Sequence, residues 1–336
     1  VLRRRQRQMC IRDRPPPLYL GCAALGCLDR DSDDPELMVT AVLESPAYVG
    51  FDVASHHGDS ETTLGDILHL PHVQTRFPRA SYQLLARGGR VRDDGSRVSW
   101  KLEDIRDSLQ ATLTNLQTQY VDTYFLFDLE YAGPDQWKAE LPRTLEYLAE
   151  QRRSGIVRRI GYACHPIETV AKLFRLLPQS RHMVDVVFCY GHTTMLHAMD
   201  ANIRTELPDY RKNTSSALSV LRESKHAIPD HIQLLDGSPL ALGQLRGRMQ
   251  PIHPLAQASP FVQQAGSRWP KVVHEWNKRL YERDGRKLAE LAIDYTLSRT
   301  IATGVIVGAS AMAEIAMAIR AWKGVELREW EILSGV

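Results

Sequence analysis

The chain has 336 residues, of which 43% are hydrophobic and 24% charged, and its formal net charge is +2. This composition supports one large core and argues against a disordered chain and against a dedicated nucleic-acid-binding protein. No apolar run is long enough to cross a membrane. The five cysteines show no metal-ligand spacing, so we expect them to be reduced thiols. We therefore expect a cytoplasmic protein that acts on a small molecule.

The first fourteen residues differ in character from the rest. They hold six arginines and one aspartate, a net +5, so the remaining chain carries about −3. The run from Gln8 to Arg14 resembles a translated sequencing adapter. We therefore predict that residues 1–14 are a gene-model artefact or a disordered arm, and that residues 15–336 form a single domain.

Short apolar runs then alternate with segments whose apolar residues recur at helical spacing. Asp34 and Pro35, for example, are typical of an N-cap and a first helical residue. The predicted strands are 18–21, 49–51, 82–86, 121–128, 156–163, 184–189, 231–236 and 304–308. The helical stripes that follow them lie in 35–43, 64–68, 102–116, 141–148, 170–177, 217–221, 288–295 and 315–319. This alternation predicts a parallel sheet closed into a (β/α)8 TIM barrel.

The stretch 49–65 carries the most informative motif. Its strand ends at Asp52, His56 and His57 follow in a polar loop, and Ser60 is the predicted N-cap of the next helix. A carboxylate at the carboxyl end of a barrel strand, followed by imidazoles, stands where this fold places chemistry.

This stretch resembles the aldo-keto reductase signature. The matching residues are Asp52, Ala54, Gly58, Ser60, Glu61, Leu64 and Gly65. The resemblance runs from about Leu18 to about Ala321 and is closest to the D-arabinose and L-galactose 1-dehydrogenase branch. Three further segments resemble the family's run into strand five, its Ser-Pro-Leu cofactor loop and its last phosphate-binding turn: 155–161, 238–245 and 307–310.

The resemblance implies a catalytic tetrad of Asp, Tyr, Lys and His, of which only the aspartate remains. The corresponding positions hold Asp52, His57, Arg87 and Phe127. Arg87 can still pair with Asp52, at about 4 kcal/mol for 4 Å and an effective dielectric of 20, but it stays charged and cannot shuttle protons. We expect Arg87 to push His57 toward its neutral, basic form, and Phe127 to make the pocket floor apolar.

The family's cofactor contacts are also reduced. The resemblance places Ser238, Leu240, Gly243, Leu245, Gly308 and Ser310 at the cofactor, where backbone N–H groups could still bind phosphates. The side chains that grip carboxamide and adenosine are replaced by Ala163, Cys164, Phe188, Ala313 and Ala318. Ser310 stands where the family often has the arginine for the 2′-phosphate. We therefore favour a protein without a cofactor, with NADP(H) as the alternative.

Other polar and aromatic residues end predicted strands at the same mouth: His56, Asp128, His165, Tyr190 and His192. Each is a candidate for lining the substrate pocket. The alternatives are a solvated loop histidine for His56, a capping residue for Asp128 and a core aromatic residue for Tyr190. We expect no metal site. The connection 237–266, rich in Pro and Gly, is predicted to be a flap over the mouth rather than a surface insertion.

Three functions follow, because fold does not fix function. The first is a non-redox cyclase, isomerase or dehydratase of a specialised metabolite such as a polyketide, with His57 as base and Arg87 as electrostatic stabiliser. The second is an NAD(P)H-dependent carbonyl reductase or sugar 1-dehydrogenase that uses His57 in place of the tyrosine. The third is a catalytically silent binding subunit. The oligomeric state stays open.

Overall fold

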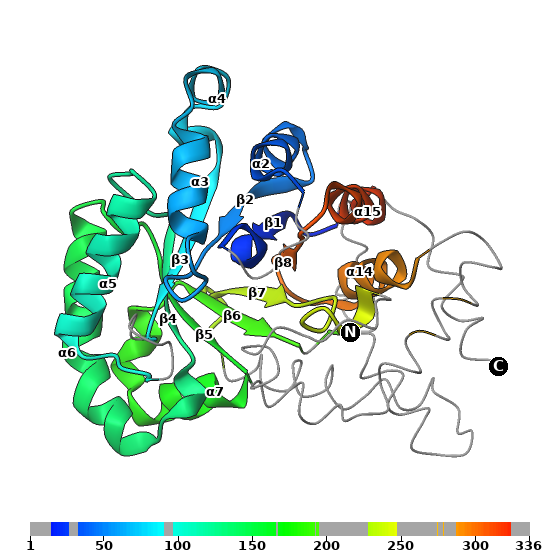
Figure 1. Cartoon of the computed structure of the whole chain (residues 1–336). Coiled ribbons are helices and arrows are strands. Elements are labelled where there is room, and N and C mark those ends of the chain that lie inside the picture. Colours follow the sequence, from blue (N-terminus) through cyan, green and yellow to red (C-terminus); the bar gives the residue numbers. More distant parts are fainter. Residues whose placement is uncertain are drawn as a thin grey trace, which may run out of the picture.

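The structure is a computed structural model that describes residues 15–26, 33–90, 97–165, 167–191, 193–194, 228–246, 274, 278 and 287–323. Eight parallel strands close into a barrel in sequence order, and β8 pairs with β1 through Leu18 and Val305. The helices lie outside this barrel (Figure 1). The predicted (β/α)8 barrel is thereby confirmed.

The strands are β1 (Leu18–Gly21), β2 (Tyr48–Asp52), β3 (Gln83–Gly88), β4 (Thr123–Phe127), β5 (Ile160–Cys164), β6 (Val186–Tyr190), β7 (Gln233–Gly237) and β8 (Gly304–Gly308). Three boundaries differ from prediction in a way that matters. The predicted fourth and fifth strands begin too early, since Val121 and Val157 form only an isolated bridge. The third strand was predicted to end at Ala86, but β3 continues to Gly88 and carries Arg87 inside the sheet.

The longer helices are α2 (Pro35–Glu44), α3 (Ser60–Leu68), α4 (Pro71–Arg76), α5 (Leu102–Asn115), α6 (Pro134–Arg153), α7 (Glu168–Leu176), α14 (Leu288–Arg299) and α15 (Met312–Trp322). Short 3-10 turns are η1 (Cys22–Gly26), η2 (Arg79–Ser81), η3 (Leu129–Tyr131), η4 (Pro178–His182) and η5 (Gln244–Arg246). Asp34 caps α2 as predicted, accepting a 2.9 Å hydrogen bond from the Glu36 N–H. The prediction for Ser60 is wrong, because Asp59 is the N-cap and Ser60 is the first helical residue.

The barrel interior is filled by side chains from alternate strand positions: Tyr19, Leu85, Phe125, Phe127, Ala163, Val186, Phe188, Leu235 and Ile306. A Cβ at Gly161 would lie 2.2 Å from the Phe125 ring, so a glycine there makes room for that ring. The opposite strand faces pack against the helices as the larger core cluster. Because side chains alternate along a strand, Arg87 lies on the same inward face as Leu85, one layer nearer the mouth.

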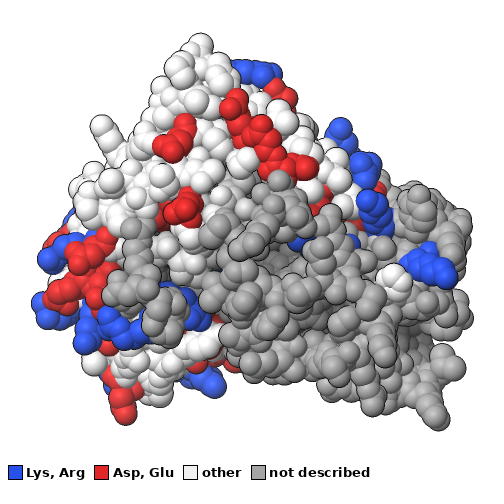
Figure 2. Space-filling model, viewed as in Figure 1, with Lys and Arg blue, Asp and Glu red and all other residues white. Residues whose placement is uncertain are grey.

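Several predictions fall outside the described residues: the segment 1–14, the helix at 217–221, the flap residues 247–266, and His192. Cys22, Cys164 and Cys189 are buried and form no disulfide bond, in line with the expectation of reduced thiols at these positions. Within the described residues, no helix combines the length and apolar character needed to cross a bilayer. On the face in Figure 2, acidic and basic side chains are mixed at the left, whereas acidic ones gather at the upper centre and basic ones at the upper right.

Candidate active site

The centre of the mouth is a buried ion pair between β2 and β3. Asp52 is the last residue of β2, and its Oδ2 accepts a hydrogen bond from Nη2 of Arg87. Only 2% of Asp52 and 6% of Arg87 is exposed. Burial raises the pKa of Asp52 and outweighs the lowering by the Arg87 guanidinium. The pair holds a guanidinium group at the top of the barrel interior.

Two phenylalanine rings surround this guanidinium. Cζ of Arg87 lies 4.8 Å from the ring centroid of Phe127 and 5.1 Å from that of Phe188. Both distances allow cation–π attraction, which is stronger where water is excluded. The inner end of the mouth therefore combines aromatic walls with one charged, hydrogen-bonding group.

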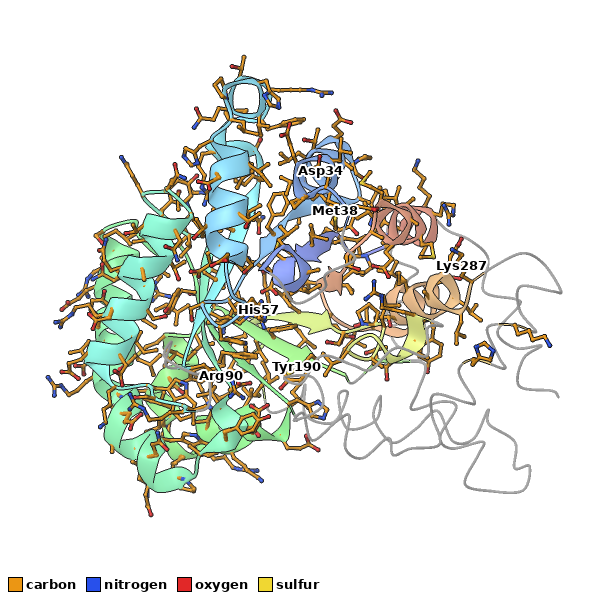
Figure 3. All side chains as sticks on the ribbon, in the orientation of Figure 1. Asp34, Met38, His57, Arg90, Tyr190 and Lys287 are labelled. Atoms are coloured by element: carbon orange, nitrogen blue, oxygen red, sulfur yellow. The ribbon has the colours of Figure 1, made fainter. Side chains whose placement is uncertain are left out.

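The two histidines of the 49–65 stretch differ in position. The His56 ring stacks on Phe127 at 5.4 Å and 12°, and it meets His57 edge-on at 4.5 Å. Burial, followed by the charges of Arg87 and Arg90, lowers the pKa of His56 to about 3. The sequence analysis expected this effect of Arg87 on His57; the structure shows it for the neighbouring His56. Figure 3 places His57 beside the strand ends, on the same side as Arg90 and Tyr190.

A second ion pair stands at the rim. Asp128, directly after β4, adopts a left-handed conformation with φ of 61°, and its Oδ2 accepts a hydrogen bond from Nε of Arg90. Asp128 is also the N-cap residue of η3, as the capping alternative proposed, although its side chain makes no capping hydrogen bond. Burial raises the pKa of Asp128 to about 6, although Arg90 opposes the change. A strained, non-glycine conformation at a strand end is typical of functional sites.

Sequence reasoning missed Glu130, which ties three loops of the mouth together. Its Oε1 accepts hydrogen bonds from the Tyr190 hydroxyl at 2.8 Å and from the His165 backbone N–H at 3.0 Å. The ring Nδ1 of His165 lies 2.6 Å from the Tyr190 carbonyl oxygen. Burial and the neighbouring Asp128 raise the pKa of Glu130 to about 7. The signal that could have found it is the Asp128-Leu129-Glu130 spacing after a strand end.

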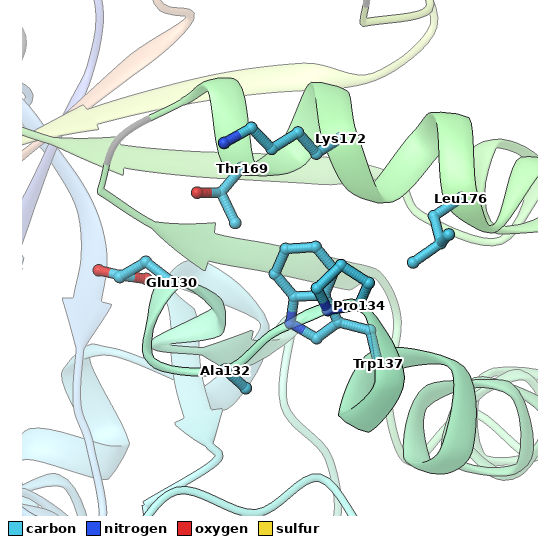
Figure 4. A pocket seen from close by; sticks show the side chains of 7 residues that line it. All are labelled: Glu130, Ala132, Pro134, Trp137, Thr169, Lys172 and Leu176. Atoms are coloured by element: carbon cyan, nitrogen blue, oxygen red, sulfur yellow. The ribbon is translucent and has the colours of Figure 1, made fainter.

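Glu130 also borders a cavity of about 330 Å³ between η3, α6 and α7. Its other lining residues are Ala132, Pro134, Trp137, Thr169, Lys172 and Leu176 (Figure 4). The indole N–H of Trp137 is already used, donating to the Leu129 carbonyl at 3.1 Å. The cavity therefore offers mostly apolar surface beside one carboxyl and one ammonium group.

The candidate cofactor loop leaves β7 at the same end of the barrel. Ser238, Ala241 and Leu242 have φ values of 59°, 51° and 54°, and Gly243 has 91°. Non-glycine residues rarely adopt this left-handed backbone conformation, because it costs conformational energy. Three of them within five positions indicate a loop that is shaped to bind a ligand. The side chains of Leu240 and Leu245 are buried and anchor this loop.

The turn after β8 lies beside this loop. Among the described residues, a Cβ at Gly308 would meet only the Gly21 carbonyl oxygen, at 4.0 Å, so a ligand phosphate can approach the backbone there. Ser310 is buried, and its hydroxyl accepts a hydrogen bond from Nη2 of Arg246. The arginine that the sequence appeared to lack at position 310 is thus brought to that position by η5. Sequence reasoning missed Arg246 because no spacing rule links it to Ser310.

These two loops fit the phosphates of a dinucleotide, through open backbone at Gly308 and the shaped turn at 238–243. The expected carboxamide contacts are not replaced at the predicted positions, since Ala163, Cys164 and Phe188 are buried and contribute no amide group. Within the described ranges, no group of three or more His, Cys, Asp or Glu side chains is arranged to hold a metal ion.

Comparisons with known proteins agree with this architecture. Residues 17–332 match the description "Aldo/keto reductase family". The chain is 27% identical over 268 residues to L-galactose dehydrogenase of Arabidopsis thaliana, covering 79% of this chain and 70% of that protein. It also resembles the holo form of an aldo-keto reductase from Bacillus halodurans, with a TM-score of 0.63, 17% identity, and coverage of 95% of this chain and 91% of the other.

Proposed function

The chain belongs to the aldo/keto reductase family, and on that premise we propose that it is an NAD(P)-dependent oxidoreductase of a small polyhydroxylated compound, such as a sugar hemiacetal. One observation carries the proposal. The barrel end that holds the Asp52–Arg87 pair and His57 also holds the open turn at Gly308 and the shaped loop after β7. Oxidation by hydride transfer needs the proton-transfer group and the dinucleotide to lie at the same end of the barrel.

The reaction would oxidise a C–H and O–H pair to a carbonyl group. When bound, the nicotinamide supplies the acceptor for the hydride that leaves the substrate carbon with its electron pair. His57 accepts the hydroxyl proton, and the Arg87 guanidinium stabilises the negative charge that develops on the oxygen. Asp52 positions that guanidinium. His56 stays neutral at physiological pH, so it contributes hydrogen bonds but no positive charge.

The rim supports a polyhydroxylated substrate. Asp128 and Arg90 present carboxylate and guanidinium groups that hydrogen-bond hydroxyls, and Arg90 lies 4.9 Å from the ring of Tyr131. Tyr190 and Phe127, with ring centroids 6.3 Å apart, add aromatic surface for the apolar face of a sugar ring. The name of the Arabidopsis thaliana relative, L-galactose dehydrogenase, supports the same class of substrate.

The test is oxidation of a panel of aldoses with NAD⁺ and with NADP⁺, followed by absorbance of the reduced nicotinamide. We expect turnover with at least one sugar and a loss of about 10²- to 10⁴-fold in kcat for His57→Ala, since a positioned base contributes that much. The matched control is His72→Ala, because His72 is exposed and pairs only with Glu36 on the outside of the barrel. Full activity of His57→Ala would exclude it as the base.

A second candidate is the non-redox cyclase, isomerase or dehydratase. The observation that favours it is the pairing of Asp52 with an arginine over two phenylalanine rings, since that pair stabilises an enolate but donates no proton. Turnover of an enolisable ketone without any dinucleotide, together with no binding of NAD(H) or NADP(H), would favour this candidate.

A further inference from the structure

The start of α15, beside the turn at Gly308, is crowded with protein carboxylates. We infer that Glu314 and Asp33 make this protein select NAD(H) over NADP(H), by taking the place and the hydrogen-bond donors that a 2′-phosphate would need. The inference rests on the proposed function, since it concerns which dinucleotide enters the same site.

Both carboxylate oxygens of Glu314 accept hydrogen bonds from donors at or near Ser310. Oε2 accepts the Ser310 backbone N–H at 2.8 Å, and Oε1 accepts a hydrogen bond from Nε of Arg246. The carboxylate is fixed in this position, because only 9% of its side chain is exposed. Arg246, which could otherwise bind a phosphate in place of the missing arginine at 310, is therefore already neutralised.

Asp33 occupies the next donor. It precedes α2, yet its Oδ2 accepts the Met312 N–H of α15 at 2.6 Å. Its own N–H donates to the Ser310 carbonyl oxygen at 2.9 Å, so the two segments are joined by two hydrogen bonds. The first N–H groups of a helix are the usual anion-binding donors. Here the N–H of Met312, the first residue of α15, is satisfied by Asp33, and the N–H of Ser310, two residues before the helix, is satisfied by Glu314.

The charges decide between the two cofactors. Asp33, Glu314 and Arg246 sum to −1 around Ser310. A 2′-phosphate carries close to two negative charges and would be repelled, whereas the 2′-hydroxyl of NAD(H) is neutral and can donate to a carboxylate oxygen. In Rossmann-type sites, a carboxylate that accepts a hydrogen bond from the ribose 2′-hydroxyl favours NAD(H), and we infer that the same chemistry acts here.

The experiment is equilibrium binding of NADH and NADPH to the whole protein, by nicotinamide fluorescence and by calorimetry, without substrate. We expect the wild-type protein to bind NADH at least about tenfold more tightly than NADPH. Glu314→Gln should lower that ratio about tenfold, and Asp33→Asn, at an exposed position, should lower it by a smaller factor. The wild-type ratio should also fall as salt rises, because screening weakens the repulsion.

Glu290→Gln is the matched control. Glu290 is 8% exposed and pairs with Arg320 at 2.8 Å between α14 and α15, so this variant loses a comparable buried acid away from Ser310. Its NADH to NADPH ratio should equal that of the wild type. Equal or tighter binding of NADPH by the wild type, or an unchanged ratio in both Glu314→Gln and Asp33→Asn, would overturn the inference alone. Binding of neither dinucleotide would overturn the proposed function with it.

Discussion

Replacing one partner of the Asp52–Arg87 pair should destabilise the protein far more than replacing both. With 2% and 6% of the residues exposed, neither charge can be hydrated once its partner is lost. Asp52→Leu should therefore lower the free energy of unfolding by about 3–5 kcal/mol. Arg87→Met should cost less at acidic pH, because burial raises the pKa of Asp52 and lets it become neutral.

The double variant Asp52→Leu/Arg87→Met should regain most of that loss, since apolar side chains suit a pocket walled by Phe127 and Phe188. The coupling between the two substitutions is then about 2–4 kcal/mol. Denaturant unfolding followed by tryptophan fluorescence measures it, provided that the slope with denaturant is the same for all variants.

An exposed ion pair provides the comparison. Glu44 and Arg76 pair on the outer surface with 44% and 62% of their side chains exposed, so Glu44→Gln should cost only about 0–1 kcal/mol. Two results would contradict this prediction: Asp52→Leu lowers the free energy of unfolding no more than Glu44→Gln does, or the losses of the two single variants simply add in the double variant. Either result would mean that Asp52 and Arg87 do not form a desolvated ion pair.

Three further changes test the rest of the site. Rebuilding the family tetrad with His57→Tyr, Arg87→Lys and Phe127→His should raise NAD(P)H-dependent carbonyl reduction by about 10²-fold or more, measured as kcat/KM on a simple aldehyde; no gain would show that these positions do not limit the reaction. Tyr190→Phe removes the hydroxyl that donates to Glu130 and should cost about 1–3 kcal/mol in denaturant unfolding, and a neutral result would mean that this bond adds nothing. Because the pKa of Glu130 rises from 4.5 to about 7 on folding, its contribution to stability is fully present below about pH 4.5 and is lost as the pH rises through about 7. The loss is about 3 kcal/mol at most, and Glu130→Gln should remove this slope from the pH dependence of the unfolding midpoint; identical slopes would contradict the assignment.

The fold was readable from the sequence because its signals are local. Apolar runs at strand spacing and stripes at helical spacing each depend on neighbours within a few residues, and eight alternations leave few arrangements other than a barrel. Asp34 before Pro35 marked the start of α2 correctly for the same reason. The strand ends were less certain, and Arg87 was placed just beyond β3 although it lies within that strand.

The sequence by itself determined the barrel, the family and the strand ends at which polar residues gather. Only the tertiary structure decided which of those residues meet. It turned His56 rather than His57 onto Phe127, joined Glu130 to Tyr190, and brought Arg246 and Asp33 to the start of α15. These pairs are separated by 60 or more residues and come from different loops. Their contacts follow from how the barrel closes and how each loop folds back over it, and no local spacing in the chain encodes that geometry.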